Sequence, residues 1–91
     1  MNSNGNVVQL FAIFDSKSCF YNQVFTAIND SVAVRDIQSL ANSKSSLVRF
    51  ASDYTLYRLG SVDLASGAVS SYSDPVHVVD FASLFPVAED K

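Results

Sequence analysis

The chain has 91 residues, of which 48% are hydrophobic and 16% charged, and its net charge is −3 at pH 7. The length predicts one domain, residues 1–91, with a modest core, because so short a chain buries only about 60–65% of its unfolded surface. The charge argues against tight binding to phosphate backbones by bulk electrostatics, since the few basic residues are spread along the chain. The large apolar share predicts a homodimer or larger homo-oligomer, because so small a body cannot hide all of its apolar surface.

The single cysteine, Cys19, cannot form an intrachain disulfide, so the fold is not expected to need an oxidising compartment. We expect its thiol to be half-buried. The first residues, MNSNGN, lack the regions of a signal peptide, and no apolar run reaches the roughly 20 residues that cross a bilayer. A cytoplasmic protein with a loose arm (residues 1–6) and a polar tail (residues 86–91) is therefore expected.

Two segments at the start of the chain are typical of strands. Residues 7–14, VVQLFAIF, form a continuous run of β-branched and aromatic residues, which predicts a strand buried on both faces. After the turn-forming sequence DSKS, residues 19–27 place apolar side chains on both faces with a period of two. We expect the two segments to pair antiparallel, with an irregularity at Asn22.

The next segment has a helical period. Its apolar residues recur at the spacing of one helical face, and they are Ala33, Ile37, Leu40 and Ala41. Asn29 or Asp30 is the natural N-cap, because either side chain can accept a hydrogen bond from the first free amides. Residues 47–52 are expected to form a further helical turn or a loop.

The second half of the chain predicts a hairpin. Residues 54–62, YTLYRLGSV, are apolar on both faces and suit a central strand, and DLASG predicts a type I turn closed by Gly67 in the left-handed conformation. The serines of the partner strand, residues 68–72, indicate a solvent-exposed face or an unpaired edge. We expect Pro75 to turn the chain before a last short strand at residues 76–81.

Residues 82–85 then predict a helical turn that Pro86 ends. Together these elements predict an α+β domain with an antiparallel sheet of four to five strands and one principal helix packed on one face.

No constellation of catalytic or metal-binding residues is visible in the sequence. His77 is the one histidine and has no second histidine for a metal site, and the three glycines are too far apart to cradle a phosphate. We therefore expect no cofactor, no bound metal and no enzymatic activity.

The tyrosines near Arg58 are the remaining candidates for a binding site. In sheets that bind single strands, bases stack on aromatic rings while a nearby cation contacts the phosphate. Tyr54, Tyr57 and Tyr72 fit that pattern with Arg58. The alternative is that these rings pack in the core with their hydroxyls at its rim.

Three segments in order resemble the small non-structural protein of gokushoviruses, tailless single-stranded-DNA phages of the microvirus group. They are FAIFDSKSCFY, FTAINDSVAVRDI and SDYTLYRLGSVDLASGAV, and they span about residues 11–69. In that family a proline and an acidic residue often precede the Asp-Tyr pair, whereas Ala51 and Ser52 stand there in this chain.

The resemblance implies a phage accessory protein, commonly labelled DNA-binding, that serves viral single-stranded DNA replication or packaging in the host bacterial cytoplasm. The residues expected to contact single-stranded DNA are Tyr54, Tyr57, Arg58, Tyr72, Arg35 and Arg49. Given the acidic balance, either an oligomer concentrates the arginines on one surface, or the protein acts without touching DNA. In the second case it is a protein-interaction module that binds a viral or host replication or capsid protein.

Overall fold

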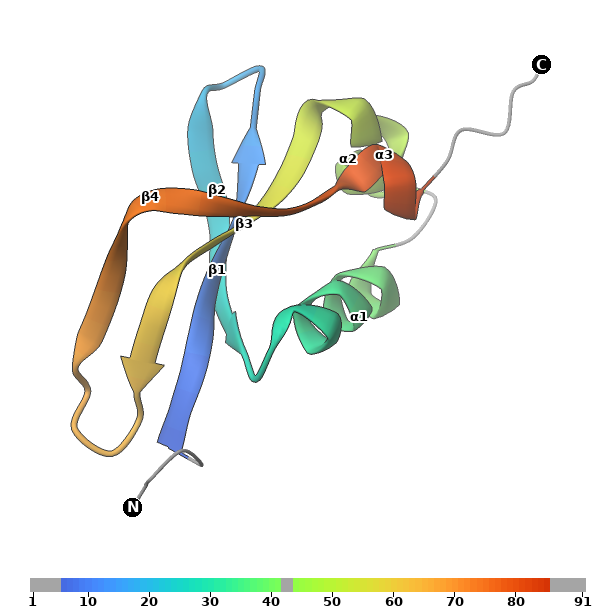
Figure 1. The fold of residues 1–91 in the computed structure, drawn as a ribbon. Helices are drawn as coiled ribbons and strands as arrows, with labels where there is room; N and C mark the ends of the chain where they lie inside the picture. Colours follow the sequence, from blue (N-terminus) through green and yellow to red (C-terminus); the bar gives the residue numbers. More distant parts are fainter. Residues whose placement is uncertain (1–5, 42–43, 86–91) are drawn as a thin grey trace.

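The computed structural model describes residues 6–41 and 44–85, and it shows an α+β protein built on a four-stranded antiparallel sheet (Figure 1). The predicted class and the antiparallel sheet are thus confirmed. The strands are β1 (Val7–Asp15), β2 (Phe20–Ala27), β3 (Tyr54–Asp63) and β4 (Val69–Asp80), in the spatial order β2-β1-β3-β4. The helical segments are α1 (Asp30–Leu40), α2 (Ser46–Arg49), the 3-10 turn η2 (Ala51–Asp53) and α3 (Phe81–Leu84).

The two central strands are the two that the sequence predicts to be apolar on both faces. In β1 the consecutive residues Phe11, Ala12 and Ile13 are all buried, which requires contacts on both sides of the sheet. β3 lies between β1 and β4. Most of the predicted arm and the whole predicted tail, with Pro86, lie outside the described residues.

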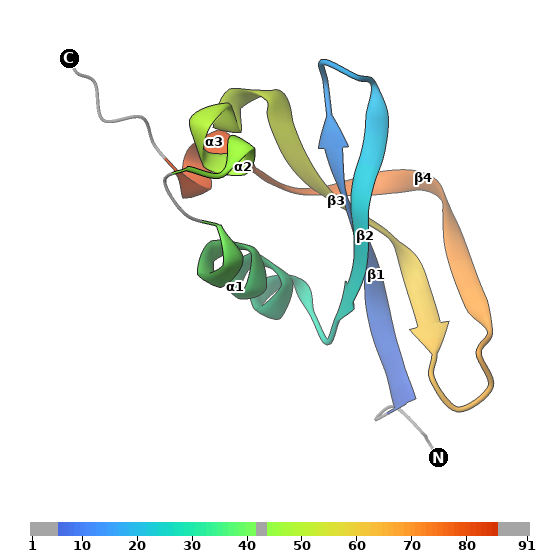
Figure 2. The same ribbon diagram turned by 180° about the vertical axis from the view of Figure 1, so that it is seen from behind.

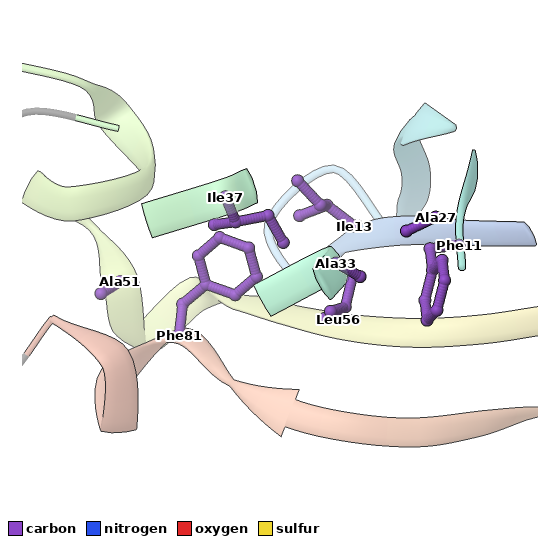
Figure 3. Packing of buried hydrophobic residues seen from close by; sticks show 8 residues of the cluster. All are labelled: Phe11, Ile13, Ala27, Ala33, Ile37, Ala51, Leu56 and Phe81. Carbon is purple, nitrogen blue, oxygen red and sulfur yellow. The ribbon is translucent and has the colours of Figure 1, made fainter. Parts of the chain in front are cut away.

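The helical segments all lie on one side of the sheet, as Figures 1 and 2 show from opposite directions. Figure 3 shows how the buried side chains of the sheet and of these segments meet. The core consists of Phe11, Ile13, Ala27, Ala33, Ile37, Ala51, Leu56 and Phe81. Its helical side is divided among α1, η2 and α3, so the expectation of one principal helix is not confirmed.

The helix α1 begins where its sequence predicts. Asn29 is the N-cap, and its Oδ1 accepts a hydrogen bond of 2.9 Å from the amide of Val32. Ala33 and Ile37 are buried, as predicted from their spacing. Leu40, expected on the same face, is instead 82% exposed, because it is the last residue of the helix and no described element covers it.

The hairpin between β3 and β4 is closed by Gly67 in the left-handed conformation, as predicted, and the hydrogen bond that closes its loop joins residues four apart rather than the three apart of a type I turn. Gly67 has a φ of 80°, and its amide donates to the carbonyl of Asp63 at 2.6 Å. The carboxylate of Asp63 also accepts from the amide of Ala65 at 2.9 Å.

The expected break at Pro75 is wrong, because β4 continues through it from Val69 to Asp80. β4 is an edge strand, where a proline removes no necessary hydrogen bond. The ladder is also irregular there: Arg58 pairs with Val76 and Gly60 with Ser71, so residues 72–75 face only one residue of β3. The strand predicted to reach residue 81 ends one residue earlier, since Phe81 begins α3.

The first hairpin departs slightly from prediction. Cys19 lies in the turn with a φ of 63° and is exposed rather than half-buried, so β2 begins at Phe20. The irregularity expected at Asn22 falls on the next residue. Phe11 pairs with Phe25 and Ile13 with Asn22, which leaves Gln23 and Val24 as a bulge opposite Ala12.

Candidate functional site

The sheet face opposite the helices carries one ring from each strand. We call this group, Phe14, Tyr21, Tyr57 and His77, the aromatic row. Phe11 and Ile13 point into the core, so Phe14 points to the opposite face of β1. Tyr21 pairs with Phe14. Tyr57 pairs with Ala12 on one side and with His77 on the other, so all four side chains share this face.

The rings of the aromatic row contact one another in sequence across the sheet. The centroids of Phe14 and Tyr21 are 4.8 Å apart, and those of Tyr21 and Tyr57 are 5.7 Å apart. The ring of Tyr57 lies 6.0 Å from that of His77 and nearly perpendicular to it. None of the four belongs to the hydrophobic core or packs against it. The row is therefore a continuous aromatic surface, and Tyr21 remains 41% exposed.

The β4 end of the row is polar. Nε2 of His77 lies 2.9 Å from Oδ1 of Asp80, and the hydroxyl of Thr55 donates to the same oxygen at 3.3 Å. The hydrogen bond with His77 is the main reason why the pKa of Asp80 is lowered from 3.8. This end of the row can thus form hydrogen bonds with a ligand whose flat part stacks on the rings.

A second cluster lies on the helical face of the sheet. Nη1 of Arg58 donates to both carboxylate oxygens of Asp30 at 2.6 Å, and its Nε donates to the hydroxyl of Tyr72 at 3.0 Å. That hydroxyl donates in turn to Oε1 of Gln9 at 3.3 Å. These bonds raise the pKa of Arg58, chiefly through Asp30. The guanidinium is therefore already paired within the chain.

The six predicted DNA-contacting residues do not form one site. Arg58 and Tyr72 are together, with the guanidinium 5.8 Å from the ring centre, but Tyr57 is on the opposite face. Successive residues of a strand point to opposite faces, so Tyr57 and Arg58 cannot share one.

The other three predicted residues lie apart from both clusters. The ring of Tyr54 packs 6.0 Å from that of Phe81 at the edge of the core, which is the alternative that the sequence left open for the tyrosines. Arg35 is exposed on α1, and Arg49 ends α2 with its guanidinium 5.1 Å from the ring of Phe50.

The sequence alone does not identify three members of the aromatic row as site residues: Phe14, Tyr21 and His77. A signal for Phe14 was present, because a strand buried on both faces must place neighbouring residues on different sides. The antiparallel pairing of the first two strands would have added Tyr21, had its register been known.

Among the residues that the structure describes, no cluster of three or more His, Cys, Asp or Glu side chains could hold a metal ion. None of the helices in residues 6–41 and 44–85 is long and apolar enough to cross a membrane.

The fold and the site define a small α+β protein with an aromatic surface on the sheet face that its helices leave open. The chain belongs to the family described as Phage ORF5 protein, whose model matches residues 8–84. It is thus a phage protein, as the resemblance implies at this coarser level. Searches of curated proteins and of solved structures gave no match.

Proposed function

We propose that this phage protein is a non-enzymatic accessory protein that contacts single-stranded DNA during viral replication or packaging, in the host bacterial cytoplasm. The observation that supports the proposal is the aromatic row, with one ring from each of the four strands on an uncovered face. Bases of a single strand stack on such rings, and every base offers a face for stacking.

The proposed contact differs from the sequence-based one in its cation. Arg58 is bound to Asp30, whereas the turn that joins the Phe14 and Tyr21 strands of the aromatic row carries the exposed Lys17. With a net charge of −3, the protein gains little from the phosphates. Binding is then carried mainly by stacking, and its dependence on salt is shallow.

The test is fluorescence anisotropy of a labelled single-stranded oligonucleotide with the wild type, Tyr57→Ala and Tyr72→Ala. Losing one stacked base costs about 1–3 kcal/mol, which is roughly a 5- to 150-fold weaker affinity for Tyr57→Ala. Tyr72→Ala is the matched control, because it removes the same ring from the opposite face.

The variants also separate the two surfaces. A loss of affinity in Tyr72→Ala and in Arg58→Ala, with Tyr57→Ala unchanged, would move the contact to the Arg58 cluster, as the sequence alone predicts. Absence of binding even at low salt would contradict the proposal altogether.

The second candidate is a protein-interaction module that binds a viral or host replication or capsid protein without touching DNA. Exposed apolar residues and the edge strand β2, which has no charged residue or proline, favour it. A protein partner that co-purifies without nucleic-acid absorbance would support this candidate over the first.

A further inference from the structure

The two edges of the sheet are differently protected. β4 carries Asp74, Pro75 and Asp80 and is irregular at two points of its ladder with β3. Charges, proline and bulges are the features that natural proteins use to prevent an edge from pairing. β2, the other edge strand, has neither a charged residue nor a proline in its eight positions, and of the three features it has only the bulge at Gln23 and Val24.

The same strand β2 also exposes apolar side chains. The first five residues of β2 are exposed, including Phe20 at 68% and Val24 at 59%. Apolar surface continues beside the strand, in a groove of about 530 Å³ between β2 and α1 that is lined by Phe25, Ile37 and Leu40 among others. A chain lying along β2 would therefore gain backbone hydrogen bonds and bury apolar surface together.

We infer that β2 pairs antiparallel with β2 of a second copy, so that two molecules share one continuous sheet. A strand paired with its own copy about a two-fold axis is self-complementary, because each N–H that meets a C=O is matched by the symmetric bond. Since β2 has no charged residue, the pairing brings no like charges opposite each other.

The bulge in β2 specifies where the axis passes. Asn22 and Phe25 both point to the helical face, because they pair with Ile13 and Phe11. An axis between Gln23 and Val24 places Asn22 opposite Phe25 of the second copy and Tyr21 opposite its Thr26. Both pairs then share a face, as neighbours in a sheet must. The shared sheet thus has both aromatic rows on the same open side.

The first test compares Val24→Lys with Val69→Lys by light scattering. Val69 is the matched control, since it is 61% exposed at the other edge. The wild type and Val69→Lys are expected at twice the chain mass of 9.9 kDa, and Val24→Lys at 9.9 kDa, because its two lysines meet near the axis. Both positions are exposed, so circular dichroism should show an unchanged fold.

The second test traps the pair chemically. In a Cys19→Ser background, Val24→Cys is expected to form a disulfide-linked dimer on mild oxidation, and Val69→Cys is not. A wild type at 9.9 kDa, a doubled mass that Val24→Lys leaves intact, or equal cross-linking of the two cysteine variants would overturn the inference. Pairing in the plane of the sheet leaves the aromatic rows uncovered, so these results do not depend on oligonucleotide binding.

Discussion

Gly60 shows how closely the two strands of the second hairpin approach. A Cβ built on Gly60 would lie 2.0 Å from the carbonyl oxygen of Ser70 and 2.9 Å from Cα of Ser71, which are backbone atoms of β4. The strands would have to separate to accept it. Gly67 is the contrasting case: its φ is positive, but among the described residues no atom beyond its two chain neighbours lies within 4 Å of an added Cβ.

We therefore predict that Gly60→Ala lowers the free energy of unfolding by more than Gly67→Ala does. Forcing atoms into a packed site costs about 1–3 kcal/mol or more, whereas a left-handed alanine at Gly67 costs about 1–2 kcal/mol. Urea unfolding followed by circular dichroism measures both. Equal losses, or a larger loss for Gly67→Ala, would show that the close approach is not a constraint.

His77 and Asp80 give the protein a small acid-dependent contribution to stability. The pKa of Asp80 is lowered below 3.8 in the folded state, so the contribution is present above that pH and is lost as the pH falls through the folded pKa. Both side chains are more than half exposed, so the effect is small.

The corresponding prediction concerns His77→Ala. Its destabilisation relative to the wild type should be larger at neutral pH than well below pH 3.8, because protonated Asp80 no longer gains from the partner. Urea titrations at the two pH values measure the difference. A destabilisation that does not change with pH would contradict this account.

At the scale of elements, one ion pair ties α1 to the sheet. Asp30 is the first residue of α1, and Arg58 of β3 contacts both of its carboxylate oxygens. The carboxylate also lies at the helix N-terminus, where negative charge is favourable. Since the side chains are 26% and 43% exposed, the pair is partly screened by solvent.

A double-mutant cycle with Asp30→Ala and Arg58→Ala is therefore expected to give a coupling energy of about 1 kcal/mol, weakened by salt. The same cycle with Arg35→Ala in place of Arg58→Ala is the control, because Arg35 is exposed on α1 and no contact between its side chain and Asp30 is observed. A coupling energy near zero for Asp30 and Arg58 would mean that the pair orients the helix without stabilising the fold.

The elements were predictable from sequence where the pattern is local. The apolar run of β1, the cap at Asn29 and the turn at Gly67 each depend on neighbouring residues, and each is found. The predicted chain turn at Pro75 was wrong because the effect of a proline depends on whether its strand lies at the edge of the sheet. The six residues predicted to contact DNA fall in separate places for a similar reason. The sequence does not give the pairing of the strands, and only the pairing shows which side chains from different strands meet.

At the scale of the whole molecule, the two sides of the sheet differ in what covers them. One side builds the core with α1, η2 and α3, and includes Phe81 with no exposed surface. The other side presents the aromatic row, whose rings are not members of that core cluster. Tyr57→Ala changes this side of the sheet and Tyr72→Ala the helical side, so comparing the two variants tells which side binds the oligonucleotide.

The interrupted ladder of β4 has a consequence for how many copies can join. A sheet with two receptive edges adds chains at both ends and grows into a fibre. If two copies pair through β2 as we infer, Pro75 and the two aspartates along β4 leave no second edge for strand addition, so the assembly stops at two copies. In that assembly Pro75 limits the number of copies and not the length of its own strand.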